Sequence, residues 1–266
     1  MKVEHGIAKE NFLLHSRDAD PHYTTRIETY FDLMQESAAM HAYNLEIGIP
    51  QLLEEDKTWV VTRTQMTVHK WAIWPTTVHV ETWPQIPYKF YYPRGCRGYS
   101  EDSEILLFES MTLWLIIDKN NYRIIKPDER YKKLLSESGR LVDPQMAKRL
   151  SFTPEDYKKV EKNPIQVQYQ DSDSNFHINN VAYLQWMIFS LPFALLDTYQ
   201  PSFVDISYLK QAFRDDSIIC YTGYGDDYSD NVDEFTLFHH IVKIEEDGNE
   251  IPLCFSTTNW KKRESF

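Results

Sequence analysis

The hydrophobic positions of the chain follow a helical period first and an alternating, strand-like period afterwards. A first helix is predicted to end near Gly48 and Pro50. Its apolar face consists of Ile27, Phe31, Met34, Ala38 and Leu45. Runs rich in β-branched and aromatic residues follow, at Trp59–Val68, Val78–Trp83, Tyr88–Tyr99 and Ile105–Ile117. This half of the chain therefore predicts one long helix followed by a meander of strands.

The second half repeats this order of elements. A second helical stripe consists of Val181, Leu184, Ile188, Leu191 and Leu195, and Pro192 is expected to break or kink that helix. Strand-like runs follow at Phe203–Leu209, Ser217–Tyr224, Glu234–Glu245 and Ile251–Trp260. Both halves predict an α+β module in which a single helix covers one face of a strongly curved antiparallel sheet.

The two halves also share a polar motif ahead of each helix. Residues 171–183 read Asp-Ser-Asp-Ser-Asn-Phe-His-Ile-Asn-Asn-Val-Ala-Tyr, and residues 18–30 read Asp-Ala-Asp-Pro-His-Tyr-Thr-Thr-Arg-Ile-Glu-Thr-Tyr. Two aspartates and the final tyrosine coincide at a constant offset (171 − 18 = 153). The chain is therefore predicted to be a duplicated module.

The duplication predicts how the chain is divided into domains. We expect an N-terminal module over residues 1–135, a linker over 136–163 and a C-terminal module over 164–266. The linker is assigned because it is polar, charged and poor in strand-forming residues, with a short helix predicted at Pro154–Glu161. Half of 266 residues is enough to bury a core in each module.

Composition narrows the protein class. A hydrophobic content of 42% with 14% aromatics predicts a packed protein rather than a disordered one. Cys96, Cys220 and Cys254 are odd in number and lack metal-ligand spacing, which favours a reducing compartment. The N-terminus has no apolar signal-like region, and no run approaches the ~18 apolar residues of a membrane helix. We therefore expect a cytoplasmic protein with no membrane span.

The net charge of −12 argues against nucleic-acid binding, which needs a basic surface. An acidic partner would need a local basic patch to dock on this chain. The first candidate patch is Lys126, Arg130, Lys132 and Lys133, and the second is Lys89, Arg94 and Arg97. Such charges also occur simply as a solvated face.

The motif at residues 171–183 is the richest in chemically active groups. A calcium loop would need Gly at its sixth position and Glu at its twelfth, where this chain has Phe176 and Ala182, so calcium binding is excluded. A structural interpretation is helix capping by Asn179 or Asn180. Capping needs only one side chain, whereas this stretch supplies two carboxylates, three amides and an imidazole.

A catalytic interpretation rests on His177, which lies two residues after Asn175 and four after Asp173. An imidazole in such surroundings can titrate near neutral pH and be oriented by both groups. Backbone N–H groups at the helix start can also polarise a carbonyl. The twin motif has His22 opposite Asn175 and Thr24 opposite His177. If the fold alone required the motif, both copies should carry it, so we interpret the full set as functional.

The tryptophans of the first half have two interpretations. They can be ordinary core, or they can line a lipophilic pocket whose depth the rings set. The pocket candidates are Trp59, Trp71 and Trp74. No metal site and no cofactor are expected.

Several motifs, in order, resemble the acyl-ACP thioesterases of plants and bacteria, which are built as two tandem hotdog modules. The stretch at 171–183 resembles that family's catalytic signature, and Trp59-Val60-Val61-Thr62-Arg63 is similar to a strand of its first module. Ile27-Glu28-Thr29 through Gln35-Glu36-Ser37-Ala38 resembles its first helix. Trp114-Leu115-Ile116-Ile117-Asp118 through Lys126-Pro127 is similar to the segment that closes the first module. The resemblance covers about residues 9–262.

The resemblance implies hydrolysis of the thioester between a fatty acyl chain and acyl carrier protein, a strongly acidic partner, to give free fatty acid. It carries catalytic roles over to Asp173, Asn175 and His177, and it implies an acyl tunnel in the first module. The chain departs from the family pattern at Gln211 and Ala212, where many relatives have Glu and, in plants, Cys. A neutral amide can position a water but cannot deprotonate it.

A water mechanism with His177 or Asp173 as base is therefore expected, with Gln211 placing the water. Two alternatives stay open: an acyl-CoA thioesterase and a non-catalytic acyl-binding protein. A hotdog dehydratase is less favoured, because nothing suggests a base aimed at a 3-hydroxyacyl chain. Two modules in one chain already supply an internal pseudo-dimer, so either a monomer or a homodimer is compatible with the sequence.

Overall fold

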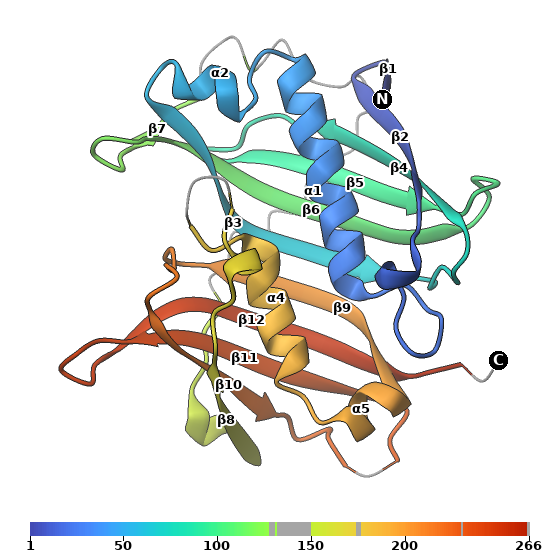
Figure 1. Ribbon diagram of the computed structural model, residues 1–266, viewed down its shortest axis with the longest axis vertical. Helices are drawn as coiled ribbons and strands as arrows, with labels where there is room; N and C mark the ends of the chain where they lie inside the picture. The colour runs from blue at the N-terminus through green and yellow to red at the C-terminus, as the bar shows by residue number, and fades with distance from the viewer. Residues whose placement is uncertain (128–130, 132–149, 174–176, 230, 265–266) are drawn as a thin grey trace. The chain divides into compact units, whose positions relative to one another are not determined.

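The computed structural model describes residues 1–127, 131, 150–173, 177–229 and 231–264 (Figure 1). The chain divides into two compact units, Met1–Ala147 (unit 1) and Lys148–Phe266 (unit 2). Each unit has one long helix lying across a face of its own antiparallel sheet (Figure 1). The α+β pattern predicted from the sequence is therefore confirmed in both halves.

Unit 1 has a sheet of strand order β1-β2-β4-β5-β6-β3, and a short strand, β7, pairs with β6. Its helices are α1 (Ile27–Asn44) and α2 (Ile49–Leu53), and Ser16–Asp18 forms a 3₁₀ turn. Its strands are β1 (Lys2–Glu4), β2 (Ile7–Leu13), β3 (Lys57–Val68), β4 (Thr77–Pro84), β5 (Tyr92–Tyr99), β6 (Leu106–Asp118) and β7 (Ile124–Ile125).

Unit 2 has a sheet of strand order β9-β12-β11-β10-β8. Its helices are α4 (Asn180–Phe189) and α5 (Phe193–Thr198), with 3₁₀ turns at Pro154–Asp156 and Tyr169–Asp171. Its strands are β8 (Lys159–Ile165), β9 (Tyr199–Tyr208), β10 (Ser217–Tyr224), β11 (Glu234–Ile244) and β12 (Glu250–Lys262).

The apolar stripes explain where the two long helices pack. Tyr30, Phe31 and Met34 of α1 are at most 3% exposed, and the helix contacts β2, β4 and β5. Burying a large apolar side chain of this kind stabilises a fold by about 1.5–3 kcal/mol. Helix α4 ends at Phe189, and Pro192 caps α5, so the predicted break at that proline is confirmed.

The structure differs from the sequence prediction at the edges of the sheets. Lys159–Ile165, which overlaps the predicted linker, forms strand β8 and pairs with β10. Its lysines and proline are compatible with an edge strand, where one side of the backbone needs no ladder partner. The predicted helix at Pro154–Glu161 is only the turn Pro154–Asp156. Linker residues 136–149 lie outside the described residues.

Among the described residues, no helix is long and apolar enough to span a membrane.

Candidate active site

The loop that precedes α4 in unit 2 is closed on itself by hydrogen bonds. Ser172 and Ile178 form an isolated β-bridge. The backbone N–H of Asp173 donates to the His177 carbonyl at 2.7 Å, and the His177 N–H donates to Asp173 Oδ1 at 3.1 Å. These two hydrogen bonds between Asp173 and His177 hold the half-buried His177 at the end of the loop, next to α4. Asn175 lies outside the described residues.

Asp171 anchors the base of this loop and is buried. Its Oδ2 accepts the Gln168 N–H at 2.8 Å and the Trp186 indole N–H at 3.1 Å. Its carbonyl accepts the Asn179 N–H at 2.7 Å. Because these bonds engage its side chain and its main chain within the fold, Asp171 serves the structure of the loop rather than chemistry.

The start of α4 offers fewer free donors than the sequence predicts. Asn179 is the cap, since its Oδ1 accepts the Val181 N–H at 3.0 Å. The N–H groups of His177, Ile178 and Asn179 also donate within the protein. The Asn180 side-chain amide nitrogen is different, because it is buried and has no partner within the described part of the chain. Asn180, which the sequence predicts only as a possible cap, is therefore the residue at this helix start whose side-chain donor is left without a partner.

The segment that carries Gln211 lies directly beside His177. The Ile178 N–H donates to the Ala212 carbonyl at 3.1 Å, and the Phe213 ring packs edge-on to the His177 ring with centroids 5.4 Å apart. Gln211 is exposed, whereas Ala212 is fully buried. The structure thus places the segment that carries Gln211 beside His177, although the two residues are 34 positions apart (211 − 177 = 34).

Tyr183 holds this segment to α4. Its buried hydroxyl accepts the Ala212 N–H at 3.0 Å and donates to the Lys210 carbonyl at 3.3 Å. Gln211 lies between these two bonded residues, so the tyrosine fixes the backbone on both sides of it.

Unit 1 contains the same arrangement around its own helix. The Asp20 N–H donates to the Thr24 carbonyl at 2.8 Å, and the Thr24 N–H donates to Asp20 Oδ1 at 3.1 Å. The Tyr30 hydroxyl accepts the Ala72 N–H at 2.8 Å and lies 3.5 Å from the Lys70 carbonyl. The duplication predicted from the sequence therefore extends to individual hydrogen bonds.

The duplication separates scaffold from chemistry. Asp173 and Asp20 accept the equivalent backbone N–H groups, so this contact belongs to the loop and is not one that orients an imidazole. Among the positions that differ are His177 for Thr24, Gln211 for Trp71, and Asn180 for Ile27. These three differences give unit 2 a histidine and two amides where unit 1 has a threonine, a tryptophan and an isoleucine.

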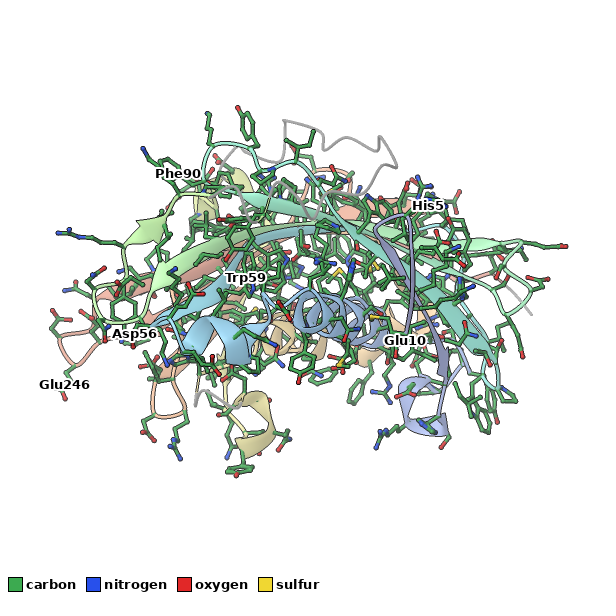
Figure 2. The ribbon with its side chains drawn as sticks, turned by 90° about the horizontal axis from the view of Figure 1, so that it is seen from above. His5, Glu10, Asp56, Trp59, Phe90 and Glu246 are labelled. Atoms are coloured by element: carbon green, nitrogen blue, oxygen red, sulfur yellow. The ribbon has the colours of Figure 1, made fainter. Side chains whose placement is uncertain are left out.

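The three tryptophans predicted to line one pocket are not brought together. The Trp59 indole N–H donates to the Ile47 carbonyl at 2.7 Å, beyond the end of α1, and its ring meets those of Tyr92, Trp114 and Tyr131. Figure 2 shows Trp59 among the interior side chains. Trp71 instead stacks on Tyr30, near the start of α1, with centroids 5.5 Å apart. Fourteen helical residues separate these ends, or about 20 Å.

Trp74 lies at the same end as Trp71. Its ring stacks on that of Tyr23 with centroids 6.4 Å apart. Trp71 and Trp74 therefore flank the loop of unit 1, while Trp59 belongs to an aromatic cluster at the far end of α1.

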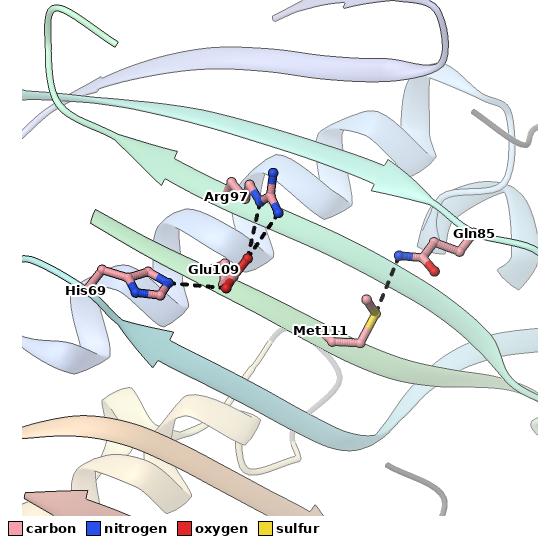
Figure 3. A network of polar contacts seen from close by, with 5 residues as sticks. All are labelled: His69, Gln85, Arg97, Glu109 and Met111. Carbon is pink, nitrogen blue, oxygen red and sulfur yellow. Dashed lines mark hydrogen bonds and ion pairs between the residues drawn. The ribbon is translucent and has the colours of Figure 1, made fainter. Parts of the chain in front are cut away.

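The basic residues are also distributed differently from the sequence prediction. Lys126 lies 5.9 Å from the centre of the exposed Phe90 ring, and Arg130, Lys132 and Lys133 lie outside the described residues. The second predicted patch is wrong. Arg94 is buried against α1, whereas Arg97 pairs with Glu109, which His69 also contacts (Figure 3). Positions three apart on a strand point to opposite faces, so Arg94 and Arg97 do not share a surface.

The cysteine thiols are poor nucleophiles. All three are free and buried. Burial raises the pKa of Cys96 and of Cys220 to about 12, so neither forms a thiolate readily at neutral pH. No group of three or more metal-ligating side chains occurs in the described ranges.

Solved structures with low sequence identity share the whole architecture. The 12:0-ACP thioesterase from Umbellularia californica matches with a TM-score of 0.84 at 17% identity, covering 99% of this chain and 100% of that one. An acyl-ACP thioesterase from Bacteroides thetaiotaomicron matches with a TM-score of 0.78 at 18% identity, covering 98% and 100%. The fold is therefore the tandem double hotdog.

Two family models match successive parts of the sequence. The acyl-ACP thioesterase N-terminal domain matches residues 6–134, and the acyl-ACP thioesterase C-terminal domain matches residues 154–262. Since the two models together cover most of the chain in the family's order, the chain belongs to the acyl-ACP thioesterase family.

Named relatives are distant but match over nearly the whole chain. A palmitoyl-acyl carrier protein thioesterase of Gossypium hirsutum is 25% identical over 99% of this chain and 66% of its own length. Oleoyl-acyl carrier protein thioesterase 2 of Arabidopsis thaliana is 24% identical over 97% of this chain and 77% of its own length. The chain spans 66% and 65% of the length of two of these plant relatives, those from Gossypium hirsutum and Cuphea viscosissima.

Proposed function

We propose that this protein is a thioesterase that hydrolyses fatty acyl-acyl carrier protein to free fatty acid and carrier protein. The observation that carries the proposal is the meeting of His177 with the Gln211 segment at the start of α4, in a chain of the acyl-ACP thioesterase family. Unit 1 keeps the scaffold of that site without its histidine, so the reaction is assigned to unit 2.

The roles follow from the chemistry of each group. The amides of Asn175 and Asn180 donate to the thioester carbonyl oxygen, which becomes negative in the tetrahedral intermediate. Gln211 holds the attacking water, because an amide can position water without deprotonating it. His177 takes one proton from that water as its oxygen bonds to the carbonyl carbon. Asp173 fixes the His177 backbone.

The second half of the reaction breaks the carbon–sulfur bond. Collapse of the intermediate expels the thiolate of the carrier's pantetheine arm, and the proton held by His177 passes to that sulfur. The products are a fatty acid and the free thiol, so protons and electrons balance without a cofactor or a metal. A covalent intermediate on the protein is not needed, in keeping with Ala212 at the position where plant relatives have Cys.

We assign the acyl chain to the interior of unit 1 and the carrier protein to a basic surface that includes Lys126. The aromatic cluster around Trp59 supports the first assignment, since a fatty chain needs an apolar lining. The exposed Phe90 beside Lys126 supports the second, because an acidic partner gains from a cation next to an apolar contact. Arg130, Lys132 and Lys133 remain candidates for the same docking surface on the strength of the sequence.

We also assign the protein to a reducing compartment such as the cytoplasm, because its three cysteine thiols are free.

The test is an assay of purified protein on matched acyl carrier protein and acyl-CoA thioesters. Release of free thiol from the carrier-protein substrates, with lower kcat/KM on the CoA thioesters, supports the proposal. Faster turnover of the CoA thioesters would replace it with an acyl-CoA thioesterase. Tight acyl binding without thiol release would replace it with a non-catalytic acyl-binding protein.

A further inference from the structure

A row of polar residues crosses the sheet of unit 1 directly beneath α1, where a hydrophobic core is expected. Arg94 of β5 pairs with Thr112 of β6, and Thr112 pairs with Thr64 of β3. Cross-strand partners point to the same face of a sheet. Because Arg94 reaches His41 of α1, the whole row faces the helix.

Arg94 is the unusual member of this row. It is 9% exposed, and its Nη1 donates to His41 Nδ1 at 3.2 Å and to Thr82 Oγ1 at 3.3 Å. No carboxylate pairs with Arg94 anywhere in the described part of the chain. A buried guanidinium without a counter-charge is costly, and proteins rarely keep one that serves no purpose.

His41 adds a buried donor that has no acceptor. An arginine only donates, so Nδ1 of His41 is the acceptor in their contact and its proton is on Nε2. Burial and the adjacent Arg94 lower the pKa of His41 to about 3, which keeps the ring neutral. The Nε2 atom is buried and has no partner among the described residues.

Two hydroxyl groups in the same layer are also unpartnered within the described ranges. Ser37 lies one helical turn before His41, on the same face of α1, and Thr64 lies at the end of the strand row. Their oxygens are buried, and the two residues are at most 1% exposed. Native proteins satisfy nearly all buried polar groups, so a cluster of several unsatisfied ones indicates a missing acceptor.

Unit 2 shows how this fold satisfies a buried histidine when no ligand is involved. His239 is fully buried in β11, and its two ring nitrogens lie 3.2 Å from Thr222 Oγ1 and 2.9 Å from Thr258 Oγ1. Two threonines on neighbouring strands are enough. In unit 1, by contrast, His41 Nε2 has no such hydroxyl partner among the described residues.

We propose that Arg94 and His41 form a buried binding site for an oxygen atom carried on the substrate's acyl chain, so that oxygenated chains such as hydroxyacyl groups are preferred over plain hydrocarbon chains. The guanidinium and the Nε2–H supply the donors, and the Ser37 and Thr64 hydroxyls can serve as donors or acceptors. The inference rests on the proposed function, which places the acyl chain inside unit 1.

The site would discriminate strongly against unsubstituted acyl chains, because such a chain leaves the donors of Arg94 and His41 without an acceptor. An unsubstituted hydrocarbon brought against Arg94 and His41 would strip water from these donors and offer no acceptor in return. Sites built around buried polar groups reject analogues that lack the matching group far more strongly than apolar pockets reject a missing methylene.

The experiment compares hydrolysis of two series of acyl carrier protein thioesters, one unsubstituted and one with a terminal hydroxyl, over chain lengths from 8 to 16 carbons. The variants are Arg94→Met, which removes the charge at similar length, and Arg94→Lys, which restores a cation. The matched control is Arg63→Met, which removes a buried arginine on the opposite face of the same sheet, next to Thr64.

For the wild type we expect at least one chain length at which the hydroxylated substrate has a kcat/KM about tenfold or more above its plain counterpart. Arg94→Met should abolish that preference, Arg94→Lys should restore part of it, and Arg63→Met should leave it unchanged. Arg94→Met should also melt no lower than the wild type, because it removes an uncompensated buried charge. If Arg94 served only to stabilise the fold, Arg94→Met would instead lower the melting temperature.

The inference is overturned if plain chains are hydrolysed as fast as hydroxylated ones at every length, or if the preference survives Arg94→Met. Failure of the proposed function looks different, since acyl carrier protein thioesters would then be hydrolysed more slowly than CoA thioesters, or not at all. In that event calorimetry with methyl 12-hydroxydodecanoate and methyl dodecanoate tests the site by itself. Equal affinity for the two esters would overturn the inference, and a preference for the hydroxy ester that Arg94→Met removes would sustain it.

Discussion

Tyr183→Phe is the most informative single substitution, because Tyr30→Phe provides a matched control in the same chain. The Tyr183 hydroxyl accepts the Ala212 N–H at 3.0 Å and donates to the Lys210 carbonyl at 3.3 Å. Tyr30 makes the same pair of contacts, with the Ala72 N–H at 2.8 Å and the Lys70 carbonyl at 3.5 Å. The two substitutions remove one oxygen each from equivalent places.

The loss of stability can be estimated from these contacts. Leaving a buried backbone N–H without an acceptor costs about 1–3 kcal/mol, and the second hydrogen bond adds about 0.5–1.5 kcal/mol. We therefore expect each variant to lose about 2–3 kcal/mol of unfolding free energy. Burial raises the pKa of Tyr30 to about 12 and raises that of Tyr183 as well, so both hydroxyls stay protonated between pH 5 and pH 9.

Turnover should separate the two variants. Tyr183 fixes the backbone on both sides of Gln211, so Tyr183→Phe should lower kcat about tenfold at temperatures where the protein stays folded. Trp71 occupies the equivalent place beside Tyr30, so Tyr30→Phe should change kcat by less than about twofold. The assays are urea unfolding and thiol release from acyl carrier protein thioesters. Equal losses of kcat in the two variants would refute the assignment of the reaction to unit 2.

Four further outcomes are expected. Asp173→Ala and Asp20→Ala should lose similar unfolding free energy, about 1–2 kcal/mol, but only the former should lose turnover. Replacing all three cysteines by Ala should leave the catalytic rate within about threefold, as followed by thiol release from the carrier protein. Gln211→Glu should introduce a new ionisation into the pH profile of kcat without abolishing turnover, and an unchanged profile would place Gln211 away from the reacting water. Partial desolvation and the neighbouring carboxylates raise the pKa of Asp32 to about 6. Between about pH 4 and pH 6 the folded protein therefore keeps a proton on Asp32 that the unfolded chain has lost. The free energy of unfolding falls as the pH rises through this range. Asp32→Asn should therefore stabilise the protein by about 1 kcal/mol at pH 7.5, a figure reduced by solvent screening, and have little effect at pH 4, as measured by urea unfolding at both values.

The sequence predicts the long helices and central strands well, because their patterns reflect burial on one face. It misses β1, β2 and β8, which lie at or next to the outer ends of the strand order. These strands carry lysines, which weaken the hydrophobic pattern that indicates a strand. The five-residue helix α2 was also missed, because it is too short for a helical period to appear. The elements that were missed are stabilised by contacts with other parts of the chain and not by a hydrophobic pattern of their own.

The sequence indicates candidate residues for the site, but it does not show which contacts each of them makes. The spacing indicates that Asp173 can reach His177. The sequence does not show whether its carboxylate accepts the backbone N–H of His177 or orients the imidazole ring. Only the hydrogen bonds of Asp20 in the twin loop show that the observed contact belongs to the scaffold. Arg94 was assigned to a surface patch because charge predicts exposure, and the contact with His41 that buries it lies 53 positions away (94 − 41 = 53).

The central claim is that His177 catalyses hydrolysis of acyl carrier protein thioesters in unit 2. The most direct measurement is steady-state thiol release from a ladder of these substrates by the wild type and by His177→Ala, with thermal melting of both proteins. We expect turnover by the wild type, a loss of roughly 100- to 10,000-fold in the variant, and melting temperatures that agree closely. Comparable turnover by a folded His177→Ala protein, or no hydrolysis of any thioester by the wild type, would contradict the account.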